Sequence, residues 1–204
     1  MLSASIHGFI LAFGLILQLG VQNVFVFNQG ALQSSYKKAL PVILTASICD
    51  TVLITLAVLG VSVIILKISW LNTILLSAGI LFLIYMGYVT WKNKPDSNSI
   101  EKASFTPKKQ IAFAASVSIL NPHAIMDTIG VIGTSSIAYS NAEKIAFTLA
   151  CILTSWIWFL SLAYVGRQAG RLGSSARFLA VLNKVSAIIM WGTAIYLAIQ
   201  LLNK

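Results

Sequence analysis

The sequence is poor in charged residues, and in acidic ones above all. Only 9% of its 204 residues are Asp, Glu, Lys or Arg, and five of these are acidic. An ordinary soluble domain carries about 25% charged residues, so this chain cannot cover a globular surface that faces water. Because 58% of the residues are hydrophobic, the composition is typical of an integral membrane protein without a separate soluble domain.

Cysteine is scarce as well. Cys49 and Cys151 both lie within apolar segments, and the sequence has neither a CxxC motif nor a cluster of Cys and His. We therefore expect no disulfide, no metal site and no cofactor. The first ten residues, MLSASIHGFI, lack the positively charged region of a secretory signal peptide, and we interpret them as the start of the first membrane helix.

Six apolar segments are long enough to cross a bilayer, which takes about 20 mostly apolar residues in an α-helix. They are residues 5–28, 41–66, 70–91, 111–133, 145–165 and 180–202. Trp70 and Trp91 bracket the third segment, and their spacing of about 31 Å in a helix matches one hydrocarbon thickness. The expected fold is all-α: a single transmembrane domain over residues 1–204 with six transmembrane helices.

The net charge of +9 comes from residues between the apolar segments, which favours the bilayer surface over nucleic acid as a partner. Eleven of the 14 Lys and Arg residues lie in or beside the connections that follow the first, third and fifth segments. Positively charged connections face the cytoplasm. This pattern predicts a multi-pass protein with both termini outside and with the polar loop 92–110 in the cytoplasm.

A weak internal repeat relates the two halves of the chain. TLAVLG at 55–60 matches SLAYVG at 161–166, an alignment that sets Cys49 opposite Ser155 and Asp50 opposite Trp156. Two three-helix units, 1–91 and 111–204, would then have opposite orientations, as in many transporters whose site lies at the midplane between the units. The alternative is coincidence, because small and apolar residues recur in membrane helices.

The fourth segment contains the stretch ILNPHAIMDT at 119–128. Pro122 removes a backbone donor and disfavours a helical Asn121, so we expect a break there, with Asn121 capping a second half-helix. The positive end of that half-helix would suit a carboxylate, and His123 and Asp127 would share one face. The alternative is a proline kink whose free carbonyl neighbouring helices satisfy.

Polar residues also interrupt the first and second segments. Gln22 and Asn23 are candidate site residues, although such amides also join membrane helices by hydrogen bonds. Asp50 lies near mid-membrane, where a charge costs at least about 2.5–3.5 kcal/mol. We expect Trp156 and Trp158 in the fifth segment to be packing residues.

The two acids of the apolar segments, Asp50 and Asp127, have only His123 as an internal cation, because no Lys or Arg lies in the core of any segment. Either the acids are protonated, or a cationic substrate or a transported proton brings the missing charge. A structural role for each acid, hydrogen-bonded to Ser or Thr, remains an alternative.

Several stretches together resemble the lysine/arginine exporter family of LysE type. GVQNVFVFNQG at 20–30 is similar to the family's GPQN…NQG signature, CDTVLI at 49–54 to its SDxVLI stretch, and LNPHAIMDT at 120–128 to its LNPHxxxDT motif. WIWF at 156–159 and MWGTAIYL at 190–197 also fit. Val21 departs from the usual Pro, which predicts a less sharply broken first helix, and Cys49 replaces a small hydroxyl residue.

The resemblance implies a secondary active exporter of amino acids in a bacterial inner membrane, with basic amino acids as substrates and protons as coupling ions. Gln22, Asn23, Asp50, Asn121, Pro122 and His123 are then the candidate substrate-binding residues. Asp127 with His123 is the candidate proton relay, and the roles of Asp50 and Asp127 are interchangeable at this stage. Self-association is open.

Two alternatives compete with this prediction. The same fold could export neutral amino acids or other small cations, although a metal cation fits poorly because no ligand cluster is visible. A more remote alternative is an intramembrane hydrolase that uses the two aspartates as acid and base. We expect a transporter and not an enzyme, because the sequence has no nucleophile constellation.

Overall fold

The computed structural model describes residues 1–17, 20–60, 69–92, 105–120, 125, 128–172 and 176–202, and every regular element among them is helical. The α-helices are α1 (Leu2–Ile16), α2 (Val21–Leu32), α3 (Leu40–Val58), α5 (Ser69–Lys92), α7 (Pro107–Leu120), α9 (Asn141–Leu172) and α10 (Ala176–Leu202). Short 3₁₀ helices η1 (Tyr36–Ala39) and η3 (Ser136–Ala138) and a π-helix η2 (Thr128–Gly133) complete the described elements.

The first expected segment forms two helices. α1 ends at Ile16, α2 begins at Val21, and the two axes differ in direction by 80°. The expectation of one helix over residues 5–28, with only a mild break where Val21 replaces Pro, is therefore wrong. The break forms without proline: Gly20 precedes α2 in an extended conformation, with φ of −80° and ψ of 166°, as is usual for the residue that caps the start of a helix.

α3 is shorter than the expected second segment, which we placed over 41–66. It ends at Val58, and Gly60 follows with φ of 74°. A glycine in this left-handed conformation just after the last turn is a common helix terminator. Residues 61–68 lie outside the described part of the chain.

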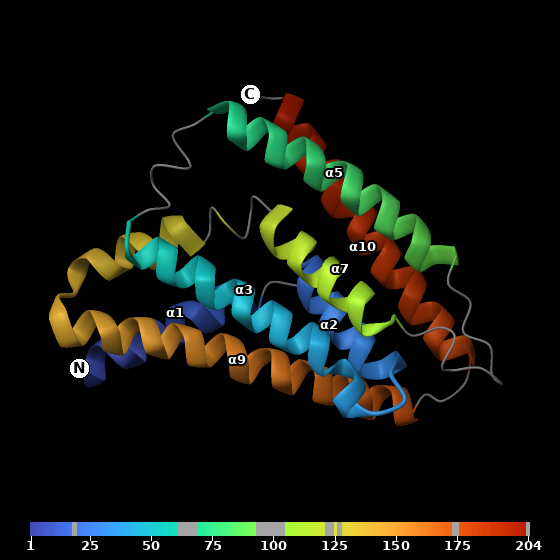
Figure 1. Ribbon diagram of the computed structural model, residues 1–204, viewed down its shortest axis with the longest axis horizontal. Helices are drawn as coiled ribbons and strands as arrows, with labels where there is room; N and C mark the ends of the chain where they lie inside the picture. Colours follow the sequence, from blue (N-terminus) through green and yellow to red (C-terminus); the bar gives the residue numbers. More distant parts are fainter. Residues whose placement is uncertain are drawn as a thin grey trace.

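Two helical stretches of the described residues, Tyr36–Val58 and Asn141–Arg171, are each long and apolar enough to cross a membrane, and α1 with α2 makes a third candidate if the bent pair is one span. α5 and α10, of 24 and 27 residues, lie side by side in opposite directions (Figure 1). The right-hand side of Figure 1 holds the C-terminal ends of α2, α5 and α9 and the N-terminal ends of α3, α7 and α10.

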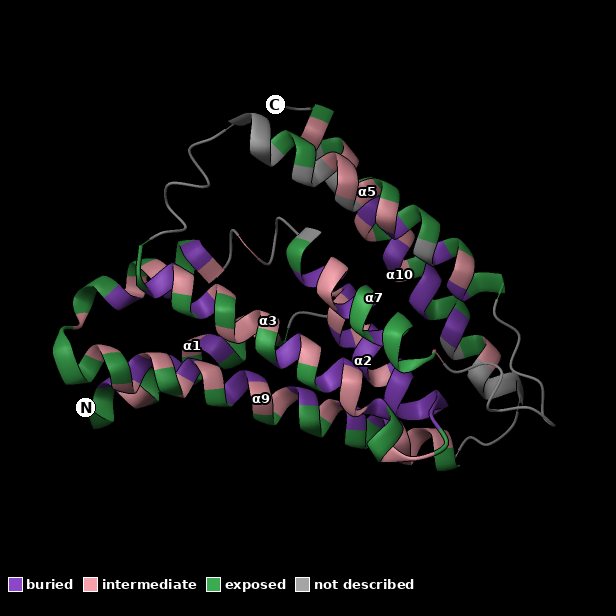
Figure 2. Ribbon diagram, viewed as in Figure 1, coloured by how far each residue is buried: buried purple, intermediate pink, exposed green. Residues whose placement is uncertain are grey.

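Apolar side chains cover the outward faces of the helices. Leu153 and Ile157 of α9, Leu81 of α5 and Ile195 of α10 are each more than half exposed. Figure 2 shows such exposed positions alternating with buried ones along the long helices. Apolar faces of this extent would be unfavourable in water but match the hydrocarbon of a bilayer, as expected for an all-α membrane protein.

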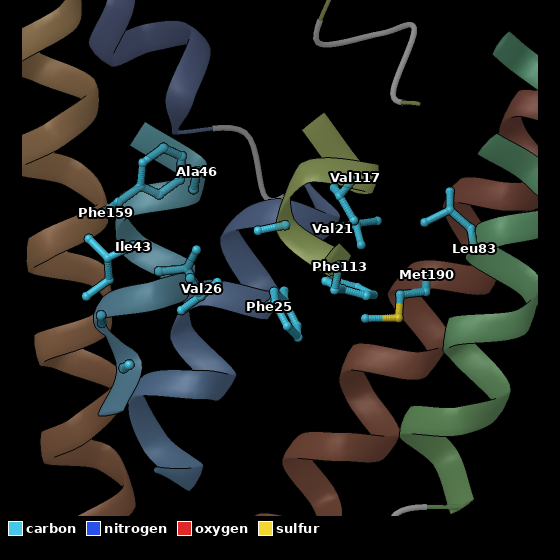
Figure 3. Close-up of a cluster of buried hydrophobic side chains, with 14 of the residues drawn as sticks. Val21, Phe25, Val26, Ile43, Ala46, Leu83, Phe113, Val117, Phe159 and Met190 are labelled. Atoms are coloured by element: carbon cyan, nitrogen blue, oxygen red, sulfur yellow. The ribbon is translucent and has the colours of Figure 1, made fainter. Parts of the chain in front are cut away.

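The interior combines one main apolar cluster with close backbone contacts. Figure 3 shows Phe25 of α2 against Phe113 of α7, with Met190 of α10 and Leu83 of α5 on the far side; the ring centroids of Phe25 and Phe113 are 3.7 Å apart. α9 packs along α1, α2 and α3. This arrangement sets the long helix α9 against both helices of the broken first segment.

Glycines allow α2 and α9 to touch backbone to backbone. A Cβ atom at Gly30 would overlap the backbone of Ala163, and one at Gly166 or Gly170 would overlap the carbonyl of Phe27 or Ala31. Small residues spaced four apart permit such close packing of membrane helices. α2 is thereby held against α9 over its whole second half.

We expect Gly166→Ala to destabilise the protein by about 1–3 kcal/mol, because the added methyl group must push α9 away from α2. Gly192→Ala is the matched control, since a Cβ there meets no atom within 4 Å. The measurement is the thermal unfolding midpoint in detergent. Equal midpoints for the two variants would contradict the close packing of α2 on α9.

Candidate functional site: a carboxylate between four helices

Asp50, in the middle of α3, is held by side chains from two other helices. Ser155 of α9 donates its hydroxyl to Oδ2 of Asp50 at 2.9 Å. Gln22 of α2 donates from Nε2 to Oδ1 at 3.4 Å, a long hydrogen bond. Both carboxylate oxygens therefore accept a hydrogen bond from a neutral group, while capacity for further donors remains.

α7 joins this arrangement through Gln22. The amide oxygen of Gln22 lies 3.2 Å from the hydroxyl of Ser118, which is also 2.9 Å from the carbonyl oxygen of Ala114. One hydroxyl has one proton, so Ser118 can donate to either acceptor but not to both at full strength. α2, α3, α7 and α9 thus meet at one polar centre, formed by Gln22, Asp50, Ser118 and Ser155.

No positive charge faces Asp50 among the described residues. The ion pair within this part of the chain joins the N-terminal amine to Glu143 at 3.0 Å, and Asp50 has only the hydroxyl and amide donors named above. Asp50 is half-buried in an apolar bundle. An ionised carboxylate in such a place is costly unless a cation or a proton reaches it.

Asn23 holds the break between α1 and α2. Its Nδ2 donates to the carbonyl oxygen of Ile16 at 2.6 Å, which is one of the last carbonyls of α1 without a helical partner. Its Oδ1 accepts from the indole Nε1 of Trp158 in α9 at 3.2 Å. The side chain therefore replaces the backbone bonds that the 80° bend removes, and it fixes the start of α2, on which Gln22 lies.

The second tryptophan is anchored beside Asp50. Trp156 donates from Nε1 to the hydroxyl oxygen of Thr51 at 3.0 Å, and Thr51 donates to the carbonyl oxygen of Ser47 at 2.7 Å. We expected Trp156 and Trp158 to be packing residues. Each makes a directed hydrogen bond to a polar residue in or next to the site, which orients α9 against α2 and α3.

The structure brings Gln22 and Asp50 into contact, as their expected shared role requires, and places Asn23 next to Gln22 on α2. Asn121, Pro122, His123 and Asp127 lie outside the described residues. The described part of α7 runs to Leu120, and Asn121 follows Ser118, a member of the polar centre, by three residues. After Asp127 the chain continues in the π-helix η2, which packs on α3.

Sequence reasoning missed the two serines of the site. Ser155 had one signal, the repeat alignment that sets it opposite Cys49, the neighbour of Asp50. Ser118 had another, because it stands four residues before Pro122, where a helical carbonyl loses its partner. Neither signal assigns a hydroxyl to a particular acceptor, since single serines are common in membrane helices.

The described part of the chain has no group of three or more His, Cys, Asp or Glu side chains that could hold a metal ion. Cys49 and Cys151 are free thiols. The groups that converge at the polar centre are thus a carboxylate, an amide and two hydroxyls, which can hydrogen-bond a ligand and exchange a proton with it.

A helical membrane protein with a half-buried carboxylate beside a broken helix has the general form of a transporter. Residues 13–201 match the model of the LysE type translocator family, and the chain belongs to that family. It is therefore a membrane transport protein and not an enzyme, and the resemblance in the sequence motifs is confirmed.

Among its relatives is a Bacillus subtilis protein named "Putative amino-acid transporter YisU", 56% identical over 98% of this chain and 91% of the relative. The arginine exporter protein ArgO of Salmonella paratyphi A is 32% identical, over 97% of this chain and 94% of the relative. ArgO of Escherichia coli O157:H7 is also 32% identical over the same shares. No solved structure matches the chain.

We expect Asn23→Ala to destabilise the protein by about 1–3 kcal/mol, because it leaves the Ile16 carbonyl and the Trp158 indole without their partner inside the bundle. Gln168→Ala is the control, since that amide is bonded to the Tyr164 hydroxyl at an exposed site. Thermal unfolding in detergent compares the two variants. A larger loss of stability for Gln168→Ala would contradict the role of Asn23 in holding the break between α1 and α2.

Proposed function

We propose that this chain is a secondary active exporter of amino acids, with basic amino acids as its main substrates. The observation that carries the proposal is Asp50, a carboxylate inside the bundle that has hydroxyl and amide donors but no cationic partner among the described residues. A substrate that brings a positive charge supplies what the site lacks. The names of the relatives support an amino-acid cargo, and that of ArgO supports a basic one.

The four groups of the polar centre suit different parts of such a substrate. The Asp50 carboxylate pairs with an ammonium or guanidinium group. Gln22 has a donor and an acceptor, and Ser118 and Ser155 can rotate their hydroxyls to follow the substrate. A cation that binds Asp50 can replace the long hydrogen bond from Gln22. The Gln22 amide is then free to bind a second group of the same substrate.

The stretch 121–127 supplies the other end of the site in this proposal. Asn121, Pro122 and His123 bind the carboxylate of the amino acid at the start of a half-helix, where free backbone donors and the positive dipole end favour an anion. In the same proposal Gln22 contacts the substrate and Asn23 supports Gln22.

Export is driven by exchange with protons. Carrying one positive charge out of an inside-negative cell costs about 2.3 kcal/mol per 100 mV, and one incoming proton cancels that charge. Asp127 with His123 forms the proton relay, and Asp50 is the cation site. Asp50 is the better candidate of the two acids for the cation because Gln22 and Ser155 already orient its oxygens.

The proposed architecture has six spans in two inverted repeats, with residues 1–91 and 111–204 as units in a bacterial inner membrane. The helix pairings support it. α1 and α2 pack on α9 as α7 and η2 pack on α3, and α3 with α9 and α5 with α10 pair across the halves. Exchanging the two units in chain order reproduces these pairings, but it does not turn the contact of α2 with α10 into that of α7 with α5.

The basic residues support the orientation with loop 92–110 in the cytoplasm. The helix ends that gather on the right-hand side of Figure 1 carry many of the basic residues: Lys37, Lys38, Lys92, Lys108, Lys109, Arg167 and Arg171. Labelling single introduced cysteines from one side of the membrane tests this assignment.

A second candidate cargo, a neutral amino acid or another small cation, is favoured by the neutral donors that surround Asp50.

We expect Asp50→Asn to raise the KM for lysine or arginine by about 10-fold or more, since it keeps the shape of the site but removes the charge that pairs with the substrate. The KM for a neutral amino acid should change little. The measurement is uptake by proteoliposomes with a panel of labelled amino acids. Glu143→Gln is the control because that carboxylate pairs with the N-terminus at an exposed position.

Full activity of Asp50→Asn on basic amino acids would contradict the cation site. If the unmodified protein carries neutral amino acids but neither lysine nor arginine, the basic substrate class is wrong while export of amino acids stands.

Asp127→Asn tests the proton relay in the same liposomes. It should abolish net efflux driven by a pH gradient and leave exchange of substrate for substrate, because exchange moves no proton through the relay whereas net efflux must reload an empty carrier. Efflux and counterflow are measured side by side. Normal pH-driven efflux in this variant would make Asp127 a structural residue.

A further inference from the structure

A second polar cluster lies outside the site described above, between α2 and α10. Asn28 of α2 donates from Nδ2 to Oδ1 of Asn183 at 3.2 Å and to the hydroxyl oxygen of Ser186 at 2.9 Å. Asn28 is only 3% exposed, and its own Oδ1 has no hydrogen-bond partner in the described part of the chain. A buried acceptor left without a donor is unfavourable, so this atom indicates a ligand or a water molecule.

Asn28 lines a small cavity that has room for about one water molecule. Its polar lining includes Gln29, Thr90 and Asn183, and its apolar lining Phe25, Leu32, Phe105 and Met190. Thr90 donates only to the sulfur of Met190, at 3.9 Å, and sulfur is a weak acceptor. The cavity therefore offers two oxygen atoms that can accept from a new donor, next to aromatic rings and a thioether.

Along α2, the cavity lies between Gln22 and the helix end that carries the basic connections. Asn28 follows Gln22 by six residues on the same helix, which is about 9 Å along the axis, in the direction of the helix end that carries the basic connections. Figure 3 shows Phe25 and Met190, two of its apolar lining residues, facing the space between α2 and α10. None of the lining residues is charged.

We propose that the Asn28 cavity is a second subsite, which receives the primary ammonium group of the substrate on its way between the basic end of the molecule and Asp50. This inference rests on the proposed function. An ammonium group has nearly the size of a water molecule and donates up to three hydrogen bonds, so it fits a cavity with spare acceptors. The planar guanidinium group is larger, so the subsite prefers lysine-like over arginine-like side chains.

The chemistry of the lining explains why such a subsite would bind and release. Phe25 and Phe105 can contact the methylene stem and attract the cation by their ring faces. A neutral amide holds an ammonium group less strongly than a carboxylate does, because the bond lacks a full negative charge. A transport path needs sites that are favourable enough to enter and weak enough to leave, and in this proposal the neutral Asn28 subsite precedes the charged site at Asp50.

The test compares two substitutions of Asn28 that act in opposite directions. Asn28→Leu removes the acceptor, and we expect the KM for lysine to rise about 5-fold. Asn28→Asp replaces the amide with a carboxylate of the same shape, and we expect the KM for lysine to fall about 5-fold with a slower turnover, because the cation is held more tightly. Both shifts should be smaller for arginine.

Thr106→Asp is the matched control, since it adds the same charge at an exposed residue just outside the cavity, and it should leave both constants unchanged. Labelled lysine and arginine in proteoliposomes are the probes. If Asn28→Leu and Asn28→Asp both raise the KM, or if neither changes it, Asn28 binds an ordered water molecule or braces α10, and the subsite is wrong. If the unmodified protein carries neither lysine nor arginine, the proposed basic substrate fails, and the subsite fails with it.

Discussion

The cost of keeping a carboxylate inside an apolar bundle is the constraint on which the rest of this structure depends. Asp50 accepts hydrogen bonds from Ser155 and Gln22, and each comes from a different helix. Neutral donors reduce the cost of burial but do not neutralise the charge. The bundle must therefore hold these donors in place and also leave a route by which a cation or a proton can arrive. The break between α1 and α2 and the long helix α9 serve the first need, and the proposed subsite at Asn28 would serve the second.

The broken first segment places Gln22 where an unbroken helix could not. A continuous helix through this segment would satisfy every backbone group by itself but would carry its side chains along a different direction. Bending by 80° exposes the last carbonyls of α1, and Asn23 and Trp158 recover part of that loss. The glycine contacts between α2 and α9 then fix the second half-helix against a long, straight neighbour. Local loss of backbone bonding is thus offset by side-chain bonds and by close packing, and the start of α2 becomes a rigid edge of the site.

Apolar length alone predicted an all-α membrane protein correctly. Six spans stay a prediction, since the described residues hold two or three candidate spans. Of the residues that the polar interruptions singled out, the structure brings Gln22 and Asp50 into contact, since each is unfavourable in hydrocarbon and needs a partner. Their role in binding a substrate stays a prediction. What the sequence could not supply is which partner. Asn23 bonds to Ile16 only because the chain bends between them, and Asp50 bonds to Ser155 across 105 residues because α3 and α9 cross there. The end of α3 at Val58 was missed because the apolar run continues past Gly60, whose positive φ ends the helix without any change in hydropathy.

The pairing of the two halves adds an argument about mechanism. The contacts that join α1 and α2 to α9 have their counterpart in those that join α7 and η2 to α3. If the repeat makes these two sets of contacts equivalent, each set can adopt the geometry that the other has now. The resulting arrangement has about the same packing energy, because the same kinds of surfaces meet in both arrangements. Alternating access in repeat transporters uses this near-degeneracy. Asp50 and Ser155 lie where α3 meets α9, at the contact that both arrangements share. In the proposed mechanism, a substrate bound there stays in place while the segments on either side open in turn, and the free energy of a cation meeting Asp50 biases the exchange.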